Sequence, residues 1–147
     1  MHELKITRHI SAPTDRVWDV LANRQEEWWC PKPWTIELIA QERRAGGRSA
    51  MIMRGPNGEE MPQEGIVLAW DEGRRIVTTD ALNAAFEPTG PFMIGFWEIE
   101  PDGDGTLYTG RARHWTEEAR KQHEAMGFHA GWTAVADQLA ALCEADA

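Results

Sequence analysis

The feature that most constrains this fold is a change in hydrophobic periodicity along the chain. Between Trp34 and Trp115, apolar residues recur with a period close to two, which is typical of strands with one buried face. Gly, Asn, Asp and Pro residues divide this region into strand-length runs, and the longest expected loop is Leu82–Gly90. Because most of the turns are short, we expect an antiparallel meander. The runs are Thr35–Gln41, Arg48–Arg54, Gln63–Trp70, Arg75–Asp80, Phe92–Glu100 and Thr106–Trp115.

Helical patterns lie on both sides of this region. The alternating segment Glu3–Ile10 predicts a further strand, and Pro13 is well placed to begin a short helix after it. A second short helix is expected over Gln25–Trp29, before Pro31. Near the end, apolar residues spaced by four and three predict one long helix from Glu117 to about Cys143, whose apolar stripe would lie on the concave face of the sheet. That stripe consists of Phe128, Trp132, Val135, Leu139 and Leu142.

Length and charge narrow the function classes. The 147 residues suit a single domain, residues 1–147. The net charge of −9 argues against nucleic acid and anionic membranes as partners, because both would bring negative charge to a negative protein. No apolar run approaches the roughly 18 residues of a membrane span, so no membrane insertion is expected. Two cysteines imply no disulfide framework, and we expect a cytoplasmic location.

Eight Trp and six Met residues suggest how the interior is built. On the expected inward faces they accompany a few polar side chains, so a space between sheet and helix would have apolar walls and a few orienting groups. Such a lining suits a small hydrophobic or amphipathic ligand. The alternative is that the same residues fill an irregular core. The candidate ligand-binding residues are Met51, Met53, Glu64, Asp80, Met93, Trp97, His114 and Met126.

Histidines are the candidates for chemistry. His114 and Asp80 would form a carboxylate–imidazole pair if they meet across the interior, and such a pair is suited to proton transfer. The alternative is that His114 stabilises the junction between the last strand and the last helix. His123 and His129 lie six residues apart and so face different sides of a helix. Without a nearby cysteine partner, they do not predict a zinc site, and no cofactor or metal is expected.

Several short motifs, taken in order along the chain, resemble a known family. They are Ile10-Ser11-Ala12-Pro13, Val17-Trp18, Trp28-Trp29-Cys30-Pro31, Gly46-Gly47, Met53-Arg54-Gly55-Pro56-Asn57-Gly58, Gly65, Thr78-Thr79-Asp80, Met126 and Gly131-Trp132. From Ile6 to Leu142 the chain is similar to homologues of the activator of the heat-shock chaperone ATPase, in the START-like (SRPBCC) helix-grip superfamily. The resemblance implies an α+β fold: two short helices after the first strand, and a curved antiparallel sheet wrapped around a long C-terminal helix.

The resemblance also implies three functions to compare. Superfamily members bind hydrophobic ligands in a cavity between sheet and helix, some catalyse cyclisation or dehydration there, and the eukaryotic relative stimulates a chaperone. Our first hypothesis is cofactor-free binding of a small hydrophobic molecule. The alternatives are a cyclase or dehydratase that uses His114 and Asp80, and a chaperone-ATPase interaction module. Ligand identity, catalytic residues and a homodimer all stay open.

Overall fold

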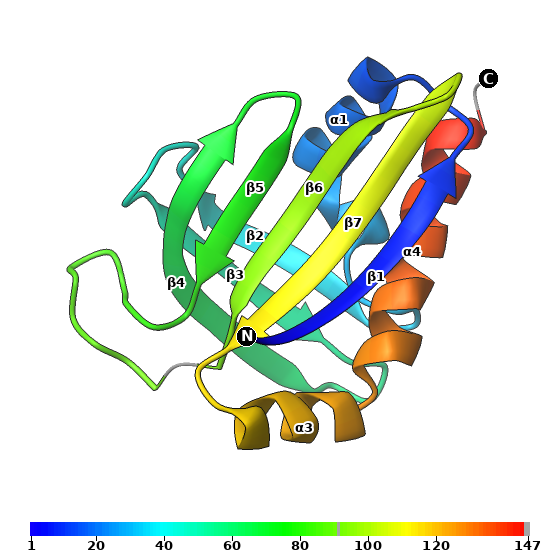
Figure 1. The fold of residues 1–147 in the computed structure, drawn as a ribbon. Coiled ribbons are helices and arrows are strands. Elements are labelled where there is room, and N and C mark those ends of the chain that lie inside the picture. The colour runs from blue at the N-terminus through cyan, green and yellow to red at the C-terminus, as the bar shows by residue number, and fades with distance from the viewer. Residues whose placement is uncertain (91, 146–147) are drawn as a thin grey trace.

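A bent, seven-stranded antiparallel sheet is the main element of the computed structural model, which describes residues 1–90 and 92–145. The strand order is β1-β7-β6-β5-β4-β3-β2, so neighbours in sequence are neighbours in the sheet except at β1, which pairs with β7. Figure 1 shows β4 curving between the part of the sheet formed by β5, β6, β7 and β1 and the part formed by β3 and β2. The strands are β1 (His2–Ile10), β2 (Thr35–Gln41), β3 (Arg48–Arg54), β4 (Glu60–Asp71), β5 (Arg75–Thr79), β6 (Ile94–Asp102) and β7 (Gly105–His114).

Four helices complete the described part of the chain. Two short helices, α1 (Thr14–Asn23) and α2 (Gln25–Trp28), lie between β1 and β2, as the sequence predicts. After β7 come α3 (Glu117–Ala125) and α4 (Phe128–Glu144). In Figure 1, α4 runs along the sheet beside β1, and α3 lies across the lower end of the sheet. The α+β class and the curved sheet with a long last helix are therefore confirmed.

The prediction of one unbroken helix from Glu117 to Cys143 is wrong. The helix ends at Ala125 and restarts at Phe128, because Gly127 between them has φ +96°. A left-handed backbone angle of this kind is accessible to glycine and costly for other residues. The break gives α3 a direction of its own, independent of α4 (Figure 1).

The main core occupies only part of the concave face. One side of α4 packs against α1 and the β1–β7–β6 part of the sheet, and Val17, Leu21, Tyr108, Val135 and Leu139 are almost completely buried there. A second cluster, around Phe128 and Trp132, joins the start of α4 to β1 and β7. The apolar stripe predicted for the last helix is thus divided between two clusters.

A β-bulge alters which residues of β4 face inward. The register between β4 and β5 shifts between Val67 and Ala69. As a result Val67 is fully buried while Leu68 is 40% exposed, although strict alternation from the buried Ile66 would place Leu68 on the inward face. Two residues earlier, Gly65 allows the backbone of β5 to approach closely, since a Cβ there would lie 2.2 Å from the carbonyl oxygen of Thr79.

A long loop separates β5 from β6, as expected around Leu82–Gly90. An isolated bridge between Leu82 and Pro88 shapes it. Strand β6 begins at Ile94, two residues later than the sequence predicts. Among the described residues, no helix has the length and apolar character needed to cross a membrane.

Candidate functional site

A pocket of about 540 Å³ opens where the bent sheet moves away from α3 and α4. Strands β3, β4 and β6, the start of α4, and the segment around Cys30 contribute to its lining. Of the eight residues predicted to bind ligand, His114 alone is absent from the described lining. The seven that border the pocket are Met51, Met53, Glu64, Asp80, Met93, Trp97 and Met126.

Aromatic rings form one wall of this pocket. Trp97 of β6 and Trp132 of α4 are stacked, with ring centroids 5.7 Å apart and planes 16° from parallel. Trp29 meets both of them edge-on, at 5.4 and 5.2 Å. Phe128 continues the stack on the other side of Trp132, at 4.8 Å. Because each of these rings packs against at least one other, this wall is preformed.

Methionine side chains form much of the rest of the lining. Met61 and Met126 are 49% and 69% exposed, which places them at the open side of the pocket. Thioether side chains are flexible and polarisable and adapt to apolar groups of different shapes. The lining therefore combines rigid aromatic rings with adaptable thioether side chains. The five methionines of the lining are Met51, Met53, Met61, Met93 and Met126.

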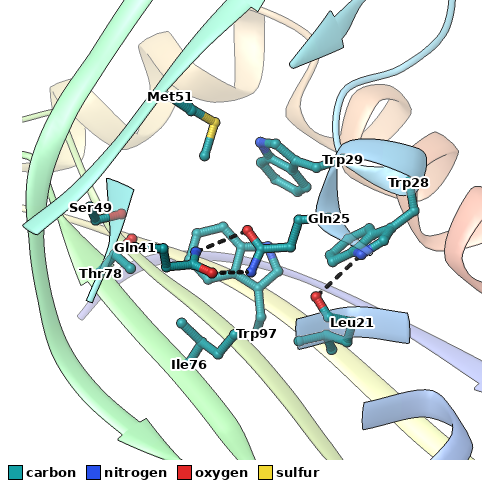
Figure 2. Close-up of a pocket in the computed structure, with 10 residues that line it drawn as sticks. All are labelled: Leu21, Gln25, Trp28, Trp29, Gln41, Ser49, Met51, Ile76, Thr78 and Trp97. Atoms are coloured by element: carbon teal, nitrogen blue, oxygen red, sulfur yellow. Dashed lines mark hydrogen bonds between the residues drawn. The ribbon is translucent and has the colours of Figure 1, made fainter. Parts of the chain in front are cut away.

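A smaller space of about 40 Å³ adjoins the inner end of the pocket and shares Trp29, Met51 and Trp97 with it. A pair of amides from α2 and β2 forms its polar side (Figure 2): Gln25 Nε2 donates to Gln41 Oε1 at 2.8 Å, and Gln41 Nε2 donates back to Gln25 Oε1 at 3.0 Å. Each amide satisfies the other, and the hydroxyl residues Ser49 and Thr78 complete the polar lining of this space.

Two histidines meet at the other end of the pocket. His114, the last residue of β7, and His123, in the last turn of α3, are 5% and 8% exposed. His114 Nε2 lies 2.9 Å from His123 Nδ1, a hydrogen-bond distance. His123 borders the pocket, whereas His114 is not among the described lining residues. Phe92 and Phe128 contact the His123 ring, with centroids at 4.5 and 5.2 Å.

Burial keeps both rings neutral near pH 7. Desolvation, together with a smaller effect of the nearby His114, lowers the pKa of His123 to about 4. Desolvation also lowers the pKa of His114, while hydrogen bonding of its ring to the His2 backbone acts in the opposite direction. The pair therefore offers the pocket an imidazole, not an imidazolium.

The predicted pairing of His114 with Asp80 does not form. The Asp80 carboxylate instead accepts hydrogen bonds from the backbone N–H groups of Phe92, at 2.8 and 3.0 Å, and of Met93, at 3.2 Å. It thereby holds the end of the β5–β6 loop at the edge of the pocket. The sequence does not predict this contact, because the donors are backbone N–H groups of a loop whose conformation the sequence pattern does not define.

Glu64 borders the pocket but its charge is already paired. The guanidinium of Arg48 donates two hydrogen bonds to its carboxylate, each of 3.0 Å, and this hydrogen bonding lowers the pKa of Glu64. Glu64 was predicted to share the inward face of β4. Its side chain is 45% exposed, so it offers a guest in the pocket little free charge.

Neither metal ligands nor reactive thiols gather at the site. No group of three or more His, Cys, Asp or Glu side chains in the described ranges is arranged to hold a metal ion. Burial raises the pKa of the Cys30 thiol to about 11, so the Cys30 that borders the pocket is a poor nucleophile. Burial likewise raises the pKa of the Cys143 thiol, which lies away from the pocket, to about 11.

Sequence reasoning missed several residues of the site. His123 received attention only as a zinc ligand, while Trp29, Met61, Phe92 and Trp132 were not selected for the lining. The available signal for His123 was Gly127, since a glycine near the middle of a predicted helix can mark its end. With a break there, His123 belongs to a separate helix, and its direction no longer follows from the apolar stripe of α4.

The comparison with protein families is decisive for the classification. The family model described as Activator of Hsp90 ATPase homolog 1-like protein matches residues 11–144. The chain belongs to this family. The resemblance expected from the short motifs is therefore confirmed, over nearly the whole length of the chain.

Solved structures agree with the family. A protein of Nitrosomonas europaea is 34% identical, with a TM-score of 0.88 over 98% of this chain and 95% of that one. A Mycobacterium smegmatis protein is 27% identical, with a TM-score of 0.77 over 95% and 89%. The AHSA1 protein of Silicibacter pomeroyi, at 16% identity, shares the fold with a TM-score of 0.73 over 99% of both chains. Among curated protein sequences, none matches.

Proposed function

We propose that this protein binds a small, neutral and largely apolar molecule in the pocket between the sheet and α4. The observation that carries the proposal is the pocket itself: about 540 Å³ bordered by stacked indoles and five methionines. Small-molecule sites are typically concave, largely apolar and supplied with a few polar groups, and their volumes span this value. Membership of a helix-grip family supports the same proposal.

The charges around the pocket favour a neutral guest. Its described lining contains no Lys or Arg, and its two carboxylates, Glu64 and Asp80, are already bound by Arg48 and by backbone N–H groups. A ligand carboxylate would lose its hydration without gaining a partner, which is costly in an apolar site. The net charge of −9 adds long-range repulsion of anions.

A pair of tryptophan substitutions tests this function. Met53→Trp places an indole in the pocket, whereas Leu68→Trp places the same group at a position that is 40% exposed and outside the described lining. Each protein is incubated with a low-molecular-weight cell extract and analysed by native mass spectrometry, after circular dichroism has verified folding. We expect the wild type and Leu68→Trp to retain the same small molecule, and Met53→Trp to lose it.

Two results would overturn the proposal. One is a wild-type protein that retains no small molecule from any extract. The other is retention of the same molecule by Met53→Trp with undiminished occupancy, because a guest unaffected by a filled pocket must bind elsewhere.

A further inference from the structure

The His123 ring presents one nitrogen to the pocket without a protein partner. Its Nδ1 faces His114, and no hydrogen bond to its Nε2 occurs within the described ranges. The fully enclosed, unpartnered side-chain atoms of those ranges are the Tyr108 hydroxyl and His114 Nδ1, so His123 Nε2 is not sealed off. Since the ring is 8% exposed and borders the pocket, the accessible space at Nε2 is the pocket.

The neighbouring ring determines what this nitrogen can do. A neutral imidazole carries one N–H donor and one acceptor nitrogen. His2 lies opposite His114 in the β1–β7 ladder, and its backbone favours the protonated ring, which can donate to it. Because His114 Nε2 already faces His123, Nδ1 is the ring nitrogen left to point towards the His2 backbone, and we take the His114 proton to be on Nδ1, where no partner lies within normal hydrogen-bond geometry. His114 Nε2 then accepts from His123 Nδ1–H, which leaves His123 Nε2 as an acceptor.

The apolar surroundings of His123 make a hydrogen bond to its Nε2 more favourable. Phe92 packs against its ring on one side and Phe128 on another, and Trp132 lies 6.4 Å away edge-on. None of these three side chains forms a hydrogen bond with His123 in the described ranges. In a site of low polarity an unpaired acceptor is costly, and a donor that reaches it is favoured correspondingly.

We propose that His123 Nε2 accepts a hydrogen bond from the ligand, and that the ligand is therefore a neutral aromatic molecule with one hydroxyl or N–H donor. The aromatic part would lie against the wall formed by Trp97 and Trp132, with the donor directed to His123. His114 is a positioning residue that holds the His123 ring in the accepting tautomer. This inference rests on the proposed function and adds to it the chemical class of the ligand.

A matched pair of probes separates the donor from the ring. 2-Naphthol carries a hydroxyl donor, and 2-methoxynaphthalene has the same ring with a methyl group in place of that proton. Isothermal titration calorimetry should show 2-naphthol binding the wild type about 3- to 10-fold more tightly, the range that one hydrogen bond supplies. His123→Phe should remove this preference while retaining 2-methoxynaphthalene. His129→Phe is the control, since His129 is exposed and bonded to Glu124, and it should keep the preference.

The outcomes distinguish this inference from the function on which it rests. If both probes bind the wild type equally, or if His123→Phe keeps the preference, the pocket binds apolar molecules but the assignment of His123 is wrong. If neither probe binds, the result counts against the pocket as an aromatic site and overturns the inference with it.

The tautomer offers a test that needs no substitution at His123. Long-range proton–nitrogen NMR spectra of the wild type should show His123 protonated at Nδ1 and unprotonated at Nε2 near pH 7. His114→Phe should let the His123 ring populate both tautomers and should reduce the 2-naphthol preference, while 2-methoxynaphthalene binding stays unchanged. The opposite tautomer in the wild type would overturn the proposal, and an unaltered tautomer in His114→Phe would remove the positioning role.

Discussion

The ring of His123, in α3, hydrogen-bonds the ring of His114, at the end of β7, over 2.9 Å. This contact joins the helix that closes one end of the interior to the last strand of the sheet. One nitrogen of His123 takes part in this buried contact, and the other faces the pocket. Stability and ligand recognition are therefore coupled at this position.

The pair predicts a dependence of stability on pH. Burial lowers the pKa of His123 in the folded protein to about 4, from 6.5 for the free side chain. Between these values the unfolded chain binds more protons than the folded one, so the free energy of unfolding falls as the pH drops from 6.5 towards 4. His123 contributes up to about 3 kcal/mol of this loss. Burial acts on His114 in the same direction, and Arg120 and His2 are the charged neighbours of the pair.

Urea unfolding of the wild type and His123→Phe at several pH values between 4 and 7 measures this contribution. The variant should lose less stability on acidification. His129→Phe, which changes an exposed histidine on α4, should follow the wild type. Parallel pH profiles for the wild type and His123→Phe would show that His123 titrates normally in the folded state.

The break between α3 and α4 predicts opposite effects of one substitution at two glycines. Gly127 has φ +96°, so Gly127→Ala should lower the free energy of unfolding by about 1–2 kcal/mol. Gly131 lies inside α4, and a Cβ there would meet only Pro31 Cγ at an ordinary 3.8 Å. Gly131→Ala should therefore be neutral or stabilise the protein by up to about 1 kcal/mol.

Thermal and chemical unfolding of both variants provide the comparison. Equal destabilisation by the two substitutions would show that backbone conformation at Gly127 does not set the helix break. Because the break directs His123 towards the pocket, Gly127→Ala should also weaken the 2-naphthol preference.

How far the sequence predicts this structure depends on the range of the interactions involved. Hydrophobic alternation and turn residues are local, and they locate β2 and β3 at the same bounds as the structure, Thr35–Gln41 and Arg48–Arg54. The family motifs then predict the curved sheet and the last helix. Local patterns do not reveal the bulge beside Val67, and one shifted residue there sends Leu68 outward.

The partners of polar side chains were harder to predict than the elements. Most of the predicted lining borders the pocket because strand parity is largely correct, as at Met51 and Met53. The partner of Asp80, however, is backbone in a loop, and the partner of His114 lies on α3, which is separated from α4 by the break at Gly127. Such contacts arise from the packing of elements on one another, which periodicity does not encode.

Two buried hydroxyls on β7 predict contrasting effects of removal. The Tyr108 hydroxyl is fully buried and has no hydrogen-bond partner among the described residues, so Tyr108→Phe should leave stability unchanged or raise it by up to about 1 kcal/mol. The Thr106 hydroxyl is equally buried but donates to the carbonyl oxygen of Ala12 at 2.8 Å. Thr106→Val should therefore cost about 1–2 kcal/mol.

Differential scanning calorimetry of the two variants tests this contrast. A marked fall in Tm for Tyr108→Phe would reveal that the hydroxyl has a stabilising partner, such as a bound water. A lower Tm for Thr106→Val alone would confirm that the hydrogen bond of the hydroxyl, and not its burial, determines its contribution to stability on β7.

The contacts of Asp80 predict a structural role at the edge of the pocket. Its Oδ1 alone accepts from both Phe92 N–H and Met93 N–H, so Asp80→Asn, which retains one carbonyl oxygen, should cost less than about 1 kcal/mol. Asp80→Ala leaves two backbone donors without that acceptor and should cost about 1–3 kcal/mol. Because the loop carries Phe92, which packs on His123, Asp80→Ala should also weaken binding of 2-methoxynaphthalene and 2-naphthol alike. If Asp80→Asn and Asp80→Ala are equally damaging, the negative charge of Asp80 and not its hydrogen bonds to the loop must be what matters, and a chemical role for this carboxylate becomes the better interpretation.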